Sequence, residues 1–151
     1  MLERPTKQTS ADPKDPRHKN TAIRSPRILV AEDDSEMRRL LVWRLRNVGF
    51  DTIECADGYQ LLDNLGNPVL SGEPDDFDLI VSDIRMPGVT GLTILSGVQL
   101  FDEFPPMILI TAFGNEETHA EAERQGVAAM FDKPFDVDDL LERVEELVPG
   151  A

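Results

Sequence analysis

Chemically active side chains follow four short apolar runs of this sequence. They are the acidic pair Glu32 and Asp33 after 28–31, Asp83 after 79–82, Thr111 after 107–110 and Lys133 after 128–131. Short apolar runs are typical of buried parallel strands, and ligands of an open parallel sheet lie outside the carboxyl ends of its strands. Clustered carboxylates bind a hard divalent cation, and a lysine beside them attracts an anion. The sequence therefore predicts a rim that suits the transfer of a phosphoryl group to a carboxylate.

The elements that must position this rim follow from the spacing of apolar and turn residues. Strands are predicted at 27–31, 51–55, 79–82, 107–110 and 128–131, and helices at 35–48, 59–65, 92–101, 116–125 and 137–147. Ser35 is the expected N-cap of the first helix. The fourth helix has the weakest apolar face, with Ala120 and Ala122 as its best core candidates. Five strand–helix repeats predict an α/β fold, a doubly wound five-stranded parallel sheet with helices on both faces and the flavodoxin-like strand order 2-1-3-4-5.

Composition excludes several classes of protein. The chain has 151 residues, enough for one domain with a core, and a formal net charge of −14, which argues against direct nucleic-acid binding through clustered basic residues. No apolar stretch approaches the ~20 residues of a membrane span, and the N-terminus lacks an apolar signal core. Cys55 is the only cysteine, so no internal disulfide forms, and it is predicted to be a small core residue. We expect a cytoplasmic protein with no membrane association.

The N-terminal segment differs in charge from the remainder of the chain. Residues 1–26 carry six Lys or Arg against three Asp or Glu, whereas residues 27–151 carry nine against twenty-six. Few apolar residues and three prolines before residue 26 predict a disordered arm or a linker remnant over 1–25. The folded domain is expected over 26–149, followed by a tail of 150–151.

The motifs at the strand ends resemble those of a known family. They are Ile28-Leu29-Val30-Ala31-Glu32-Asp33-Asp34, Asp83-Ile84-Arg85-Met86-Pro87-Gly88 with Gly91, Thr111-Ala112 and Lys133-Pro134-Phe135. Together and in this order they are similar to the receiver domain of two-component response regulators, over roughly Pro26 to Val148. Each motif alone is common, and their combination at the ends of four strands is specific.

The resemblance implies that Asp83 accepts a phosphoryl group from a sensor histidine kinase or a histidine phosphotransfer protein. It implies a Mg²⁺ site made by Glu32, Asp33, Asp83 and the backbone carbonyl of Arg85. It assigns phosphoryl-oxygen binding to Thr111 and Lys133, and the Ile84 amide is expected to contribute. Asp34, just past the acidic pair, is interpreted as a solvated or helix-capping acid. The family also implies a cis peptide bond between Lys133 and Pro134.

The same resemblance implies a signalling module that catalyses only its own phosphorylation and dephosphorylation. Its output is expected at the surface of the fourth helix, fifth strand and fifth helix, where a downstream protein target binds. One departure concerns Met130, which stands where the family usually has Tyr or Phe three residues before the lysine. The strand period places Phe131 on the opposite face. Thr90 stands where an acidic residue is common, and little effect is expected from it.

Two other classes of protein fit the sequence less well. An aspartate-nucleophile phosphatase of the haloacid dehalogenase type needs two aspartates separated by one residue after its first strand, which Glu32-Asp33-Asp34 does not supply. A receiver-like scaffold that is never phosphorylated has no need for the complete set of acids, hydroxyl and lysine. A single-domain regulator and a receiver excised from a longer protein remain equally compatible with the sequence.

Overall fold

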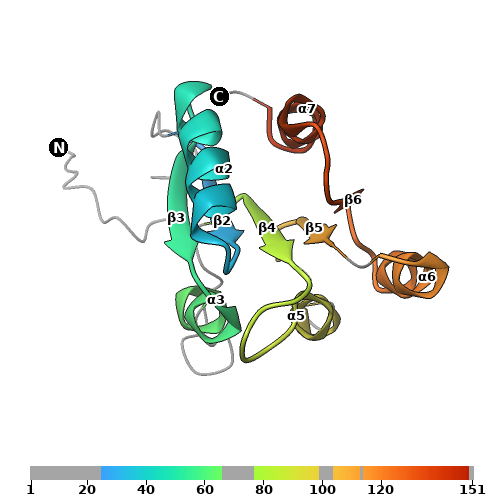
Figure 1. The fold of residues 1–151 in the computed structure, drawn as a ribbon. Coiled ribbons are helices and arrows are strands. Elements are labelled where there is room, and N and C mark those ends of the chain that lie inside the picture. Colours follow the sequence, from blue (N-terminus) through green and yellow to red (C-terminus); the bar gives the residue numbers. More distant parts are fainter. Residues whose placement is uncertain (1–24, 66–76, 99–103, 113, 150–151) are drawn as a thin grey trace, which may run out of the picture.

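The structure is a computed structural model that describes residues 25–65, 77–98, 104–112 and 114–149 (Figure 1). Nearly all of the arm predicted over 1–25, the tail 150–151 and the end of the helix predicted at 92–101 lie outside these residues. The proposed domain boundaries therefore stay predictions. Among the described helices, none combines the length and the apolar character that crossing a bilayer requires.

A parallel sheet forms the centre of the domain. Its strands are β2 (Arg27–Ala31), β3 (Asp51–Cys55), β4 (Leu79–Asp83), β5 (Met107–Thr111) and β6 (Ala129–Asp132). They lie in the order β3-β2-β4-β5-β6, which is 2-1-3-4-5 in chain order and confirms the predicted topology. Every residue of the inner strands β4 and β5 is buried, whereas the edge strands β3 and β6 are partly exposed. This difference explains why the inner strands have continuous apolar sequences.

Helices cover both faces of the sheet (Figure 1). They are α2 (Ser35–Asn47), α3 (Gly58–Leu65), α5 (Gly91–Val98), α6 (Glu116–Arg124) and α7 (Val137–Leu147). Helices α2 and α7 pack against one face, where Leu41, Leu45, Leu140 and Val144 join Val30 in one apolar cluster. Helices α3, α5 and α6 pack against the other face, in a second cluster that includes the fully buried Cys55. The sheet is thus doubly wound, and Cys55 is a core residue as predicted.

The strand ends lie one residue further along the chain than predicted at three places. Asp83 and Thr111 are the last residues of β4 and β5 rather than the first residues after them. Strand β6 runs to Asp132 because Asp132 pairs in register with Thr111. The polar side chains at this rim are therefore held by the sheet itself.

The N-cap of α2 is Asp34, so the prediction of Ser35 was wrong. The Asp34 carboxylate accepts hydrogen bonds from the amides of Glu36 and Met37 at 3.0 and 3.4 Å, and Ser35 is the first helical residue. A carboxylate satisfies free amides and also interacts favourably with the positive end of the helix dipole. The interpretation of Asp34 as a helix-capping acid is confirmed.

Among the described helices, α6 has the smallest buried side chains. Ala122 is its buried residue and Ala120 is half-buried, whereas α7 buries Leu140, Leu141 and Val144. The weak apolar face predicted from the sequence is confirmed. Small buried side chains contribute little hydrophobic free energy, so α6 can shift at lower cost than α7.

Candidate functional site

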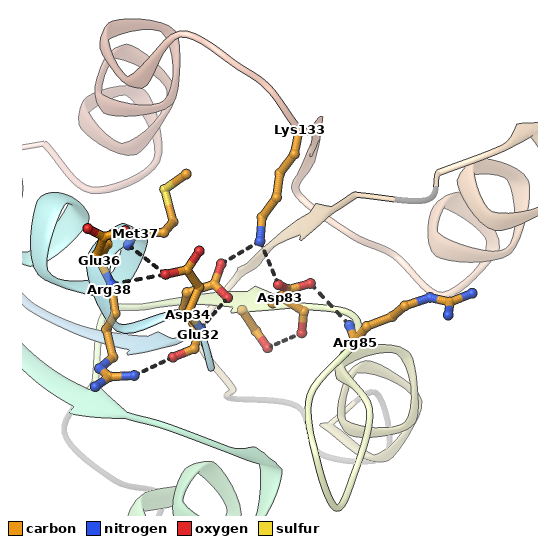
Figure 2. A network of polar contacts seen from close by, with 9 residues as sticks. Glu32, Asp34, Glu36, Met37, Arg38, Asp83, Arg85 and Lys133 are labelled. Carbon is orange, nitrogen blue, oxygen red and sulfur yellow. Dashed lines mark hydrogen bonds and ion pairs between the residues drawn. The ribbon is translucent and has the colours of Figure 1, made fainter.

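The carboxyl ends of four strands bring the predicted site residues together. Asp83 and Thr111 end the adjacent strands β4 and β5, Glu32 directly follows β2, and Lys133 directly follows β6. Figure 2 shows the Lys133 side chain reaching from β6 to the carboxylates of Glu32 and Asp83. Because all four strands are parallel and in one sheet, their ends share one rim, as the sequence predicted.

Lys133 joins the two buried carboxylates of the rim. Its Nζ donates hydrogen bonds to Glu32 Oε1 and Asp83 Oδ2, both at 2.8 Å. The side chains of Glu32 and Asp83 are only 1% and 6% exposed. Burial alone lowers the pKa of Lys133, but the hydrogen bonds to Asp83 and Glu32 outweigh it and leave this pKa raised. Lys133 is therefore a fixed positive charge at neutral pH.

Burial disfavours the charged form of Glu32. Burial raises the pKa of Glu32 to about 7, and the nearby Asp83 adds to the effect, while hydrogen bonds from Lys133 and the Asp34 amide oppose it. The Asp34 amide lies 3.1 Å from Glu32 Oε2. A buried carboxyl group that retains its proton near neutrality is poorly solvated, and a cation beside it would favour its charged form.

The acids also have the geometry of a cation site. Glu32, Asp33 and Asp83 each offer a carboxylate oxygen, and these oxygens lie within 4.8 Å of one another. Asp33 is exposed while the other two are buried, so the cluster is accessible from solvent on one side. Oxygen donors that converge in this way fit a hard divalent cation such as Mg²⁺.

The Asp83 carboxylate accepts a hydrogen bond from the amide of Arg85, and the Ile84 amide has another partner. The Arg85 amide donates to Asp83 Oδ1 at 3.1 Å, whereas the Ile84 amide donates to the Ile110 carbonyl at 2.8 Å. The expected role of the Ile84 amide was therefore wrong, because this amide belongs to the β4–β5 hydrogen-bond ladder. Figure 2 shows the Arg85 side chain pointing away from Asp83, so Arg85 faces the rim through its backbone.

Thr111 and a neighbouring pocket complete the rim. The Thr111 side chain is buried, and its carbonyl accepts a hydrogen bond from the Lys133 amide at 2.7 Å. A pocket of about 580 Å³ opens beside these residues. It is lined by Asp33, Ile84, Arg85, Met86, Pro87, Thr90, Leu92, Thr111 and Thr118. The Lys133–Pro134 peptide bond is cis, as the resemblance implied.

Arg38 is a site neighbour that sequence reasoning missed. Its Nη1 donates to the Glu32 backbone carbonyl at 2.6 Å (Figure 2). Its Nε donates to Glu54 at 3.1 Å. These contacts connect α2 to the ends of β2 and β3 and fix the backbone that carries Glu32. An arginine in an amphipathic helix gives no sequence signal for such a contact, because the contact depends on how the helix lies on the sheet.

A tightly packed junction connects the rim to α6. His119 Nε2 lies 3.0 and 2.9 Å from the two carboxylate oxygens of Asp132. Gly114 packs against this contact and against Thr111, since a Cβ at Gly114 would clash with Asp132 Oδ1 and lie 2.8 Å from Thr111 Cγ2. A movement of the Thr111 side chain would therefore change its packing against Gly114.

The two faces of β6 carry different residues near Lys133. Met130 packs in the cluster under α3, α5 and α6, and Phe131 packs in the cluster under α2 and α7. The rings of Phe131 and Phe135 are 5.7 Å apart. Phe131 is thus on the face opposite to Met130, as the strand period predicted, and does not take the place of the usual aromatic residue.

Comparison with known proteins agrees with this geometry. The family described as response regulator receiver domain matches residues 28–145. The chain is 31% identical over 123 residues to sporulation initiation phosphotransferase F of Bacillus subtilis, covering 82% of this chain and 94% of that protein. It is 35% identical over 124 residues to chemotaxis protein CheY-3 of Vibrio cholerae, covering 80% and 90% of the two chains. The non-phosphorylated HemR receiver domain of Leptospira biflexa superimposes with a TM-score of 0.72 at 25% identity, over 84% of this chain and 97% of that domain.

Proposed function

We propose that this chain, which belongs to the response regulator receiver family, receives a phosphoryl group on Asp83 and thereby changes a protein-binding surface. Receiver domains are signalling modules of two-component systems that are phosphorylated on aspartate. The observation that carries the assignment to Asp83 is its pairing with Lys133 at a buried acidic rim, 2.8 Å from Nζ. The donor is a sensor histidine kinase or a histidine phosphotransfer protein.

The rim fits Mg²⁺ as a cofactor. Glu32, Asp33 and Asp83 would hold the ion together with the carbonyl of Arg85. A cation there would favour the charged form of Glu32, whose pKa is raised by burial. When bound, Mg²⁺ supplies charge that reduces the repulsion between a carboxylate and the phosphoryl oxygens.

The side chains of the rim have separable tasks in the transfer. A carboxylate oxygen of Asp83 forms a bond to phosphorus as the bond from phosphorus to the donor nitrogen breaks, and that nitrogen keeps the electron pair. Lys133 exchanges its contact with the Asp83 carboxylate for a phosphoryl oxygen, so the incoming charge meets a fixed cation. The Arg85 amide, now on Asp83 Oδ1, is placed to donate to a second phosphoryl oxygen. Water attack on the acyl phosphate reverses the modification, so the domain catalyses only its own phosphorylation and dephosphorylation.

The output surface is formed by α6, β6 and α7. A phosphoryl group adds roughly −1.5 to −2 charge at the rim, and Thr111 can donate a hydrogen bond to it. Such a bond to a charged acceptor contributes on the order of 1.5–3 kcal/mol. Because Thr111 Cγ2 is close to Gly114, its movement displaces the loop that begins α6. This helix buries only Ala122, so the displacement reaches the output surface.

The partners proposed for this surface are proteins. The relatives include a phosphotransferase, chemotaxis proteins and transcriptional regulators. In the case of the regulator NtrC of Escherichia coli, this chain covers 24% of the length of that protein. The acidic net charge does not favour direct nucleic-acid binding by this chain. A downstream protein target and a cytoplasmic location are therefore proposed.

The direct test is phosphorylation by a small donor. Purified protein is incubated with acetyl phosphate and Mg²⁺, and intact mass is measured. We expect the gain of one phosphoryl group, absence of labelling when EDTA replaces Mg²⁺, and no gain in Asp83→Asn. Asp63→Asn, an exposed aspartate of α3, serves as a matched control that labels like wild type. Undiminished labelling of Asp83→Asn would refute the assignment.

A further inference from the structure

The loop 84–90 follows Asp83 and leads into α5, and it carries Arg85. We infer that Gly58 and Tyr59, at the start of α3, are positioning residues that hold this loop and thereby set the strength of Mg²⁺ binding. The inference rests on the proposed metal site, to which the Arg85 carbonyl contributes. It adds two residues from a helix that takes no direct part in that site.

Gly58 brings the backbone of α3 into contact with the backbone of the loop. Its amide donates to the Pro87 carbonyl at 3.1 Å, and Gly58 is buried. A Cβ at this position would clash with the Val89 carbonyl oxygen and lie 2.7 Å from the Val89 nitrogen. Both obstructing atoms are backbone, so no side-chain rotation could relieve the clash. Only a residue without a side chain permits this approach.

Tyr59 covers the turn of the loop from outside. Gly88 has φ +90°, and a Cβ there would lie 2.6 and 2.7 Å from Cε2 and Cδ2 of the Tyr59 ring. The Tyr59 residue is nevertheless 63% exposed. The ring therefore lies on the loop backbone and contributes little to the core. Its contact with Gly88 restrains a position that glycine would otherwise leave free.

The base of the same loop is already fixed at the rim. The Gly91 amide donates to the Ile84 carbonyl at 3.0 Å, and the Arg85 amide donates to Asp83 Oδ1 at 3.1 Å. The contacts of α3 with Pro87, Gly88 and Val89 restrain the far end of the loop. Arg85 lies between these two anchored regions, so the direction of its carbonyl depends on both.

Loss of the α3 contacts should weaken metal binding without removing a ligand. Residues that orient metal ligands typically change affinity by about 10–100-fold when substituted. Tyr59 acts through two intervening residues, so we expect the Mg²⁺ concentration for half-saturation to rise by about threefold to tenfold in Tyr59→Ala, below that range. Gly58→Ala, which forces the backbones apart, should raise it further.

The experiment measures Mg²⁺ binding in two ways on the full chain. Melting temperature is followed against Mg²⁺ concentration without a phosphodonor, and the initial rate of labelling by acetyl phosphate is followed against Mg²⁺ concentration. Tyr59→Ala and Gly58→Ala are compared with Tyr59→Phe, which keeps the ring, and with Leu62→Ala, an exposed apolar residue of the same helix. We expect both midpoints to rise in the first two variants and to stay at the wild-type value in the last two.

The outcomes separate this inference from the function on which it rests. A wild-type protein that shows neither Mg²⁺-dependent melting nor Mg²⁺-dependent labelling would refute the proposed function. A wild-type response with an unchanged midpoint in Tyr59→Ala would overturn the inference alone. An equal rise in Leu62→Ala would also overturn it, because the effect would then come from general loosening of α3. If Gly58→Ala does not fold, the surface variant Tyr59→Ala still decides the question.

Discussion

The stability of the metal-free domain should fall as pH rises from about 5 to 8, because of Glu32. In the folded protein, burial raises the pKa of Glu32 to about 7, against the ordinary value of 4.5. Between these two values the folded state keeps a proton that the unfolded state has lost. Stability therefore decreases with pH across this window. The favourable contribution is fully present below about pH 4.5 and is lost as pH rises through about 7.

The size of this effect follows from the difference between the two pKa values. Each pKa unit corresponds to roughly 1.36 kcal/mol, so the change from 4.5 to about 7 is worth about 3 kcal/mol. Glu32 is fully buried, so solvent screening reduces the effect little. Domains of this kind have total stabilities of about 5–15 kcal/mol, which makes the loss large enough to measure.

Bound Mg²⁺ should reduce this pH dependence. A cation held by Glu32, Asp33 and Asp83 favours the charged form of Glu32 and binds only the folded state. At a concentration ten times its Kd, the ion should add about 1.4 kcal/mol to the stability. The benefit of Mg²⁺ should grow from pH 5 to pH 8, because fewer protons then compete for the site.

Urea unfolding at several pH values, in EDTA and in Mg²⁺, tests the reasoning. In EDTA we expect the free energy of unfolding of Glu32→Gln to vary less with pH than that of wild type. Glu145→Gln, an exposed glutamate of α7, should keep the wild-type slope. A wild-type stability in EDTA that is flat between pH 5 and 7.5, or equal slopes in wild type and Glu32→Gln, would refute the account.

Two further variants examine other parts of the rim. Lys133→Met removes the cation between two buried carboxylates. Urea unfolding should show that the metal-free domain is destabilised by about 3 kcal/mol, and intact mass should show labelling by acetyl phosphate slowed about 100-fold. An unchanged labelling rate would contradict the role of Lys133. Thr111→Val should still be labelled but should lose the change in amide exchange that phosphorylation produces in residues 114–125 of wild type, a change we expect to exceed that in 35–48. An undiminished change in the variant would show that Thr111 does not transmit the signal.

The placement of the rim could be predicted because it depends on few physical rules. Continuous apolar runs indicated inner strands, and parallel strands in one sheet necessarily present their carboxyl ends at one edge. Asp83, Thr111 and Lys133 therefore had to lie close together once the order β2-β4-β5-β6 was inferred. The weak packing of α6 was equally accessible, because it follows from the lack of large apolar residues on one helix face.

Features that depend on the local course of the backbone could not be predicted in this way. The Ile84 amide was expected at the rim, but the register between β4 and β5 directs it to the Ile110 carbonyl. The contact of Arg38 with the Glu32 carbonyl depends on the position of α2 on the sheet. The close approach of Gly58 to the loop after Asp83 joins residues from different repeats, and no pattern within either repeat records it.

The positions of Met130 and Gly114 together indicate how the signal leaves the rim. In receivers with an aromatic residue at the Met130 position, a ring can occupy the space that the hydroxyl residue vacates. Here the neighbouring aromatic residue of the strand, Phe131, packs on the other face of the sheet. Thr111 instead lies against Gly114, and Gly114 lies against the contact between His119 and Asp132. A shift of Thr111 toward a phosphoryl group therefore acts first on the loop before α6 and on the connection of α6 to β6. Because Ala122 is the one buried side chain of α6, this path requires less free energy than rearranging the packed face under α7.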